Sequence, residues 1–158
     1  MGTATYLIAL GSNRRSRAGS PERTLRAALS AVGGVLAVSP MMGTPAMGPS
    51  SRRFANAVAL VRSDEPPPAM LARLKGIERA LGRRPGRRWG ARAIDLDLIG
   101  WSEGAWAGPG LQIPHAAFRA RRFVLAPLVA VAPGWRDPLT GLSPRQLLAR
   151  IDRRRPRA

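Results

Sequence analysis

The sequence predicts an α+β protein built on one antiparallel sheet, and three observations support this fold class. Short apolar segments indicate strands, whereas two longer segments with apolar residues three or four positions apart indicate helices. These segments follow one another as strand, helix, strand, strand, helix, strand. The chain has 158 residues, of which 45% are hydrophobic, and this is enough for one domain with a real core.

The first part of the chain supplies a strand, a helix and a second strand. Residues 5–10 form a short apolar strand that ends at a Gly-Ser-Asn sequence. Ser20 as the N-cap and Pro21 at the first helical position begin a helix, and the two glycines at positions 33 and 34 end it. Residues 35–41 are expected to form the second strand.

The next part supplies a strand, a helix and a fourth strand. A loop over residues 43–53 is too rich in Gly, Pro and Ser for regular structure, and a third strand over residues 54–61 follows it. A second helix begins at residues 64–66, and a basic loop over residues 82–90 leads into the last strand at residues 93–99. This order is that of a ferredoxin-like βαββαβ core, an antiparallel sheet with helices on one face.

The remaining residues form a C-terminal extension of this core. Residues 123–131 are apolar enough to be buried, and Ser143 with Pro144 begins a last short helix that continues through Ile151. We expect a single domain over residues 1–158, in which residues 152–158 form a frayed basic tail.

Composition excludes several classes of protein. The chain has no cysteine, so it has neither disulfides nor thiolate metal sites, and its apolar segments are far shorter than a membrane span. With no basic segment and apolar signal core at the start, we expect a cytoplasmic protein. The net charge of +17 by itself suggests nucleic acid, but aromatic residues make up only 5% of the chain, which disfavours a base-stacking surface.

Two carboxylates and a group of arginines stand close together in the sequence. In the strand over residues 93–99, Asp95 and Asp97 lie on one face, within an apolar segment. Like charges in such surroundings are costly unless a cation compensates them, and either Mg²⁺ or arginine can do so. Guanidinium groups bind phosphate oxygens, so this stretch predicts transfer of a phosphate-type group. The arginines are Arg83, Arg84, Arg87, Arg88 and Arg92, with Trp89 among them.

Each of these features also has a structural explanation. Aspartates two positions apart often lie at a solvated edge or in an internal salt bridge, and arginines often form a solvated or nucleic-acid-binding face. Asn56 is either a core or turn amide with its hydrogen bonds satisfied, or an amide whose donor and acceptor pair with a planar heterocycle. His115, the only histidine, is either structural or a phosphate contact, since Arg119, Arg121 and Arg122 follow it.

Four blocks of residues are distinctive in their order and spacing. They are Ala9-Leu10-Gly11-Ser12-Asn13; Thr44-Pro45 through Gly48-Pro49 to Phe54 and Asn56; Arg88-Trp89-Gly90-x-Arg92-x-Ile94-Asp95-Leu96-Asp97; and Ile113-Pro114-His115 with Arg121-x-Phe123-Val124-Leu125. With these blocks, the chain resembles the 6-hydroxymethyl-7,8-dihydropterin pyrophosphokinase family over nearly its whole length.

The resemblance implies a reaction, its substrates and its site residues. Members of this family transfer the β,γ-pyrophosphate of ATP to the hydroxymethyl group of the pterin and release AMP, in folate biosynthesis. By resemblance, Asp95 and Asp97 hold two Mg²⁺ ions, and Arg83 and Arg92 join them as catalytic residues. The implied ATP-binding residues are Glu78, Trp89, Arg92, Leu98, His115 and Arg121, and the implied pterin-binding residues are Thr44, Pro45, Met47, Phe54, Asn56, Trp89 and Phe123.

The chain departs from the family pattern at a few positions. Pro85 occupies the second position of an Arg-x-Arg sequence, which leaves open whether Arg83, Arg84, Arg87 or Arg88 contacts phosphate. Lys75, the only lysine, stands where some members have Gln. Neither change removes an expected metal ligand.

Two other functions compete with this enzyme. A ferredoxin-like domain also serves RNA recognition, but that function requires exposed aromatic residues on the strand centres, where the first and third strands offer only Tyr6 and Phe54. A catalytically silent relative would not need to retain the expected site residues. We therefore expect an enzyme that is a monomer, has ATP and the pterin as its small-molecule substrates, and binds neither membrane nor nucleic acid.

Overall fold

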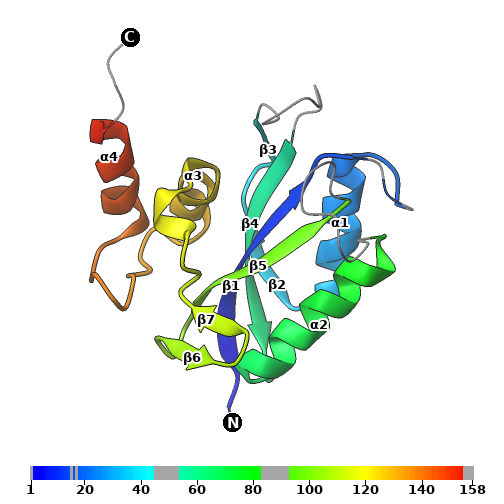
Figure 1. The fold of residues 1–158 in the computed structure, drawn as a ribbon, viewed down its shortest axis with the longest axis horizontal. Helices are drawn as coiled ribbons and strands as arrows, with labels where there is room; N and C mark the ends of the chain where they lie inside the picture. The colour runs from blue at the N-terminus through cyan, green and yellow to red at the C-terminus, as the bar shows by residue number, and fades with distance from the viewer. Residues whose placement is uncertain (1, 15, 17, 45–53, 83–92, 155–158) are drawn as a thin grey trace.

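The computed structural model describes residues 2–14, 16, 18–44, 54–82 and 93–154 (Figure 1). The elements in chain order are β1 (Ala4–Ser12), α1 (Pro21–Val32), β2 (Val35–Val38), β3 (Met42–Thr44), β4 (Phe54–Ser63), α2 (Pro67–Ala80), β5 (Asp95–Trp101), β6 (Trp106–Gly108), β7 (Leu111–Ile113), the 3₁₀ helix η1 (Phe118–Ala120), α3 (Arg122–Val131) and α4 (Pro144–Arg154).

One antiparallel sheet organises these elements. Its strands pair in the order β2-β4-β1-β5, and β3 pairs with β4 beyond the end of β2. Strands β1 and β4 pair along their whole length, from Ala4 opposite Ser63 to Ser12 opposite Ala55. Strands β6 and β7 form a separate hairpin beside β5. The predicted antiparallel sheet packed with helices is therefore confirmed.

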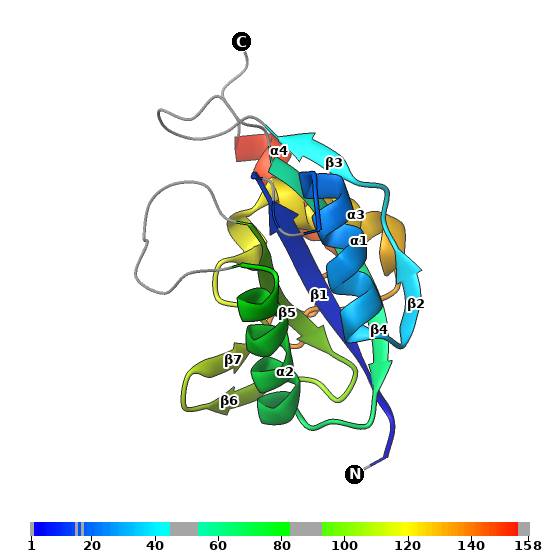
Figure 2. The ribbon, with the colours of Figure 1, turned by 90° about the vertical axis from the view of Figure 1, so that its right-hand side faces the viewer.

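Helices cover both faces of this sheet (Figures 1 and 2). Helices α1 and α2 pack on one face over a core that includes Tyr6, Leu25 and Leu74. Helix α3 packs on the other face against β4, and α4 packs on α3; this second core includes Leu7 and Phe118. The prediction of helices on one face thus describes only α1 and α2, because the apolar segment over residues 123–131 folds back over the opposite face.

Several boundaries differ from the predicted ones for identifiable reasons. The second predicted strand, residues 35–41, is β2 and already ends at Val38, shortly before Pro40, because proline has no N–H to donate to a ladder; β3 begins beyond the predicted strand, at Met42. Just before this proline, the Ser39 side chain accepts a bond from Val58 N at 2.9 Å and replaces part of the ladder. Helix α4 continues through Arg154, beyond the predicted end at Ile151, and residues 155–158 lie outside the described residues.

Helix α1 begins and ends as its sequence predicts. The Ser20 hydroxyl accepts a hydrogen bond from Arg23 N at 3.3 Å, which satisfies one of the free amides of the first turn. Gly33 ends the helix with a φ of 69°, and its N–H donates to Leu29 O. Among the described residues, no helix is long and apolar enough to cross a membrane.

Candidate active site

Strand β5 places the two aspartates on the edge of the sheet. It is the last strand in the pairing order, with Asp97 opposite Ala9 and Asp95 opposite Gly11 of β1. Residues Ile94, Leu96 and Leu98 belong to the core beneath α1 and α2, whereas Ile99 belongs to the core beneath α3. Since successive side chains of a strand alternate between faces, Asp95 and Asp97 lie on the α3 face, as the sequence predicts.

Glu78 of α2 holds the backbone of β5 between the two aspartates. Its side chain is 1% exposed, and its Oε2 accepts a hydrogen bond from Leu96 N at 2.9 Å. Its Oε1 lies 3.7 Å from Lys75 Nζ, on the preceding turn of the helix. In the structure Glu78 lies against the backbone of β5 and fixes the strand that carries Asp95 and Asp97, and its contact with ATP stays a prediction.

Asp97 lies near an imidazole and a guanidinium group. Its Oδ1 is 4.0 Å from His115 Nε2, and its Oδ2 is 3.9 Å from Arg121 Nη1. Both distances exceed hydrogen-bond length, so these contacts are electrostatic. The structure therefore brings together three of the predicted residues from separate parts of the chain.

Burial raises the pKa of the Asp97 carboxyl, and repulsion from Asp95 raises it further. Attraction to His115, Arg121 and Lys75 offsets only part of this increase, so the pKa stays above its ordinary value. A carboxylate with a raised pKa in partly buried surroundings is stabilised by an added cation. The site thus has the electrostatic character expected for binding a metal ion with a phosphate group.

The backbone around His115 fixes the direction of its imidazole. His115 N donates to Ile99 O at 3.3 Å, which ties this residue to β5. Its Nδ1 accepts a hydrogen bond from Ala117 N at 3.2 Å, so in the neutral ring the proton is on Nε2, the atom that faces Asp97. His115 can therefore donate a hydrogen bond into the site.

The raised pKa of Asp97 predicts how pH affects stability. Below the ordinary aspartate pKa of about 4, this carboxyl is protonated in the folded and the unfolded chain, and Asp97→Asn should not change the melting temperature. As pH rises through the raised pKa, the ionised carboxylate destabilises the folded protein, and the variant should become the more stable of the two. Melting temperatures with EDTA between about pH 3 and about pH 8 test this. A wild-type protein that is the more stable one at neutral pH would contradict it.

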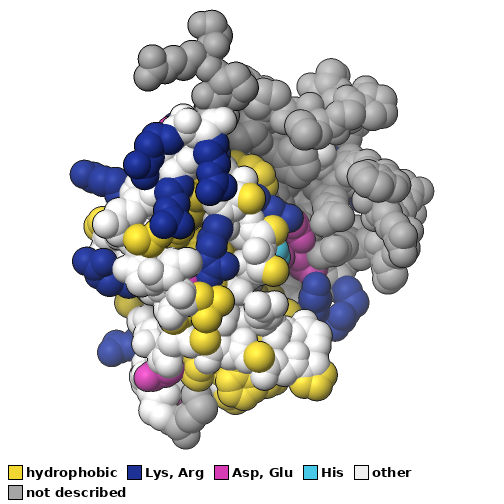
Figure 3. Space-filling model, turned by 60° about the vertical axis from the view of Figure 1, so that its left-hand side comes forward, with side chains coloured by type: hydrophobic (Ala, Val, Ile, Leu, Met, Phe, Trp, Pro, Cys, Tyr) yellow, Lys and Arg dark blue, Asp and Glu magenta, His cyan; other side chains and the backbone are white. Residues whose placement is uncertain are grey.

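A cavity of 510 Å³ opens beside Asp97. Helix α2 contributes Leu71 and Lys75, and the hairpin of β6 and β7 contributes residues that include Gly108, Gly110 and Gln112. The predicted ATP-binding residues Leu98 and His115 line this cavity as well. Figure 3 shows acidic side chains next to an imidazole, with Lys and Arg side chains close by, on one side of the molecule. Lys75 is thus a site residue that the sequence marked only as a departure from the family pattern.

Among the predicted pterin-binding residues, Asn56 lies in the sheet two strands away from Asp95. Across the sheet, Met42 pairs with Asn56, Asn56 with Gly11, and Gly11 with Asp95. Residues directly opposite in antiparallel strands point to the same face, about 5 Å apart from strand to strand, so Asn56 and Asp95 lie roughly 10 Å apart on the α3 face. A Cβ atom on Gly11 would approach Asn56 Oδ1 to 3.2 Å, so glycine keeps the space between them open. This role of Gly11 depends on strand pairing and was missed in the sequence.

Three further pterin positions belong to this end of the sheet. Thr44 pairs with Phe54 across β3 and β4, and α3, which carries Phe123, contacts both strands. Phe123 is 39% exposed, and the Arg121 guanidinium lies 5.8 Å from the centre of its ring. The other predicted site residues lie outside the described residues: Pro45, Met47, Arg83, Trp89 and Arg92.

The residues present are compatible with Mg²⁺ bound together with a phosphate ligand. Among the described residues, no group of three or more His, Cys, Asp or Glu side chains is arranged to hold a metal. Mg²⁺ commonly uses one or two protein carboxylates, and water and substrate phosphates complete its coordination. Asp95 and Asp97 are such a pair, and a cation would offset the repulsion from Asp95 that helps to raise the pKa of Asp97.

Together these features define an α+β protein with a candidate active site on an edge strand. On one side of the site is the cavity, and on the other is the row of paired residues that contains Gly11 and Asn56. A sequence profile of the 7,8-dihydro-6-hydroxymethylpterin-pyrophosphokinase (HPPK) family matches residues 7–133. The match covers more than half of the chain, and the protein belongs to this family of enzymes.

Individual relatives agree with the family match. The chain is 37% identical over 107 residues to the 2-amino-4-hydroxy-6-hydroxymethyldihydropteridine pyrophosphokinase of Synechocystis, over 68% of this chain and 55% of that protein. It is also 37% identical over 137 residues to the enzyme of that name from Pseudomonas aeruginosa, over 83% of this chain and 82% of that protein. A Plasmodium falciparum HPPK-DHPS structure with pterin and p-hydroxybenzoate has the same fold, with a TM-score of 0.73 at 14% identity over 95% of this chain and 42% of that one.

Proposed function

We propose that this protein transfers the β,γ-pyrophosphate of ATP to the hydroxymethyl group of 6-hydroxymethyl-7,8-dihydropterin, with Mg²⁺, as a step of folate biosynthesis. The pterin oxygen bonds to the β-phosphorus, the bond from that phosphorus to the α-phosphate oxygen breaks, and AMP leaves. The hydroxyl proton is released to solvent. The observation that carries this proposal is the place of Asp97. It lies beside His115 and Arg121 at the cavity, two residues from Asp95, which is paired through Gly11 to Asn56.

The residues around Asp97 would hold the phosphates and neutralise their charge. Arg121 and the Nε2 of His115 both face the Asp97 carboxylate and can donate to phosphate oxygens placed between them. Lys75 adds a positive charge at the cavity wall. When bound by Asp95 and Asp97, Mg²⁺ offsets the phosphate charge and lowers the pKa of the attacking hydroxyl.

The two substrates would lie on opposite sides of the aspartates. The adenosine part of ATP fits the cavity of 510 Å³ between α2 and the hairpin of β6 and β7. The pterin would lie over the row that contains Gly11, with Asn56 paired to its amide edge and Phe123 against its ring. From the resemblance, Pro45, Met47 and Trp89 complete the pterin site, and Arg83 and Arg92 approach the phosphates.

The decisive assay follows AMP. We expect AMP release from ATP and Mg²⁺ only when 6-hydroxymethyl-7,8-dihydropterin is present, with no ADP, because the bond that breaks lies between the α- and β-phosphates. ADP formation would point to transfer of a single phosphoryl group and would refute the proposed reaction. Untouched ATP, together with RNA binding that weakens steeply with salt, would favour a nucleic-acid-binding domain.

Asn56→Ala should raise the KM for the pterin about ten- to a hundredfold, because a polar group that pairs with the ring edge is worth about 1–3 kcal/mol. The KM for ATP should change little, since Asn56 is not among the residues that line the cavity beside Asp97. Steady-state kinetics with each substrate varied in turn measure both constants. Gly11→Ala is the companion variant: its Cβ would crowd Asn56 Oδ1 at 3.2 Å and should shift the same constant in the same direction. Equal changes in both KM values would contradict this placement of the pterin.

A further inference from the structure

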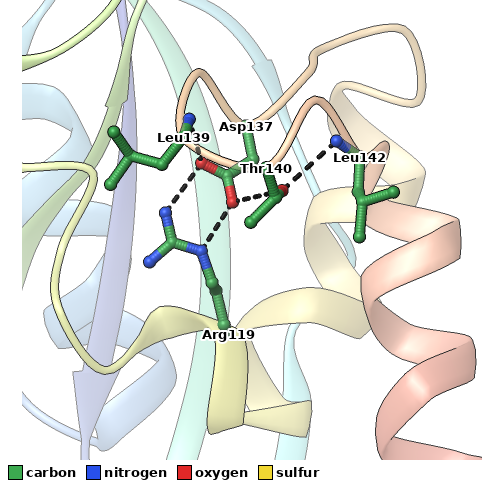
Figure 4. A network of polar contacts seen from close by, with 5 residues as sticks. All are labelled: Arg119, Asp137, Leu139, Thr140 and Leu142. Atoms are coloured by element: carbon green, nitrogen blue, oxygen red, sulfur yellow. Dashed lines mark hydrogen bonds and ion pairs between the residues drawn. The ribbon is translucent and has the colours of Figure 1, made fainter.

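An ion pair with a fully buried carboxylate lies between η1 and the loop that precedes α4 (Figure 4). Asp137 has no exposed surface. Arg119 donates to both of its oxygens, from Nε to Oδ2 at 2.5 Å and from Nη2 to Oδ1 at 2.7 Å. The hydroxyl of Thr140 donates to Oδ2 at 2.7 Å, and Leu139 N donates to Oδ1 at 3.0 Å. Four donors thus hold one carboxylate in a single orientation.

These contacts keep Asp137 charged. Burial by itself raises the pKa of its carboxyl, but the hydrogen bonds from Arg119, Thr140 and Leu139 outweigh burial, and the pKa lies below its ordinary value. Since this pKa is lower in the folded than in the unfolded chain, the pair stabilises the fold above the ordinary aspartate pKa. That contribution is lost as pH falls through the lowered pKa. At neutral pH the pair is therefore fully formed.

The segment that Arg119 anchors carries both His115 and Arg121, the two neighbours of Asp97. Phe118 N donates to His115 O at 3.2 Å, and Arg121 N donates to Phe118 O at 3.2 Å. The segment from His115 to Arg121 is thus a continuous series of turns, with Arg119 in η1 near its end. Its first and last residues are the two that approach Asp97 to 4.0 Å and 3.9 Å.

The loop that carries Asp137 is itself fixed against β5. Trp135 packs edge-to-face on Phe118, with ring centres 5.8 Å apart, and the guanidinium of Arg119 lies 4.7 Å from the centre of the Phe118 ring. Trp135 also packs closely over Gly100 of β5, where a Cβ atom would come within 2.8 Å of its ring. The loop, η1 and the strand that carries Asp97 are therefore packed against one another.

We propose that the Arg119–Asp137 pair is a positioning device that holds His115 and Arg121 toward Asp97 for the phosphates of ATP, an inference that rests on the proposed function. Burial of an ion pair contributes little net stability compared with apolar residues of similar size, so stability alone does not account for it. The two parallel hydrogen bonds fix the orientation of the Arg119 side chain and of the segment that carries it. A phosphate site requires donors in a fixed orientation.

The test replaces the pair without leaving a charge buried. Arg119→Met with Asp137→Leu should fold, and should raise the KM for ATP and lower kcat/KM about ten- to a hundredfold, the effect of a displacement on the order of 1 Å. The KM for the pterin should change little. Arg119→Lys keeps the charge but loses the fork, and should lie between the wild type and the double variant. If the double variant does not fold, Arg119→Lys decides the question by the same measurements.

A spectroscopic measurement separates positioning from stability. His115 is the only histidine in the chain, so its imidazole resonances report on this segment alone. These resonances should shift in the double variant, and they should broaden if the segment moves. We expect this even if the melting temperature of the double variant equals that of the wild type. The matched control is Arg122→Met with Asp152→Leu, which removes an exposed pair at 3.1 Å between α3 and α4 and should change neither resonances nor kinetics.

The outcomes are distinct. Wild-type kinetics and unshifted imidazole resonances in the double variant or in Arg119→Lys would overturn the proposal, as would an equal effect of the control pair. Absence of pterin-dependent AMP release from the wild-type protein would instead refute the proposed function. In that case the His115 resonances would still show whether the pair positions this segment.

Discussion

Asp97→Ala should lower kcat by at least about a thousandfold, because metal-ion stabilisation of a phosphate transition state is worth several kcal/mol. Asp97 is the carboxylate nearest to His115 and Arg121, and it lies at the cavity and on the face that leads to Asn56. Removing it takes away a proposed metal ligand and leaves His115 and Arg121 without their common neighbour.

The fold should survive this change, which makes the loss of activity interpretable. Repulsion from Asp95 contributes to the raised pKa of Asp97, so removing the charge relieves strain at neutral pH. The melting temperature should not fall, and binding of an ATP analogue with Mg²⁺ should weaken in calorimetry. Asp152→Ala is a suitable control, since it removes an exposed carboxylate of α4 that pairs with Arg122 of α3. Near-wild-type turnover by Asp97→Ala would show that this aspartate is not a metal ligand.

Local patterns account for the parts of the fold and site that were predictable. The alternation of polar and apolar residues over 93–99 places Asp95 and Asp97 on one face, and the structure confirms it because strand periodicity depends only on the chain itself. The cap at Ser20 and the end of α1 at Gly33 are local for the same reason. Family resemblance then adds His115 and Arg121, which local patterns alone leave open between structural and functional roles.

Features that depend on pairing between distant segments were not predictable. The place of Gly11 between Asn56 and Asp95 follows from the register of three strands, and no short window of sequence encodes that register. The resemblance singles out Glu78, but not its hydrogen bond from Leu96 N of β5, which joins residues 18 positions apart in the sequence. Arg119 and Asp137 are also 18 residues apart, and nothing in their separate surroundings indicates that they meet. Strand β3 is only three residues long and is defined by its pairing with β4.

Arg121→Ala should lower kcat/KM roughly 10²- to 10³-fold, the effect of losing one preorganised donor to a developing charge. Arg121 occupies the N-cap position of α3, its Nη1 lies 3.9 Å from Asp97 Oδ2, and its guanidinium lies 5.8 Å from the centre of the Phe123 ring. It therefore stands between the proposed phosphate site and the proposed pterin site. Arg121→Lys should recover only part of the activity, because an ammonium group lacks the planar fork.

The neighbouring residue provides the control for this variant. Arg122→Ala removes the same charge one position further along, but that side chain pairs with Asp152 on α4 and does not face Asp97. Its kcat/KM should stay near the wild-type value. Arg121 and Asp97 are close enough to couple, so the double variant Arg121→Ala with Asp97→Ala should lose far less than the product of the two single effects. Independent, multiplicative losses would mean that the two residues act at separate steps, and that the contact between them is not part of the phosphate site.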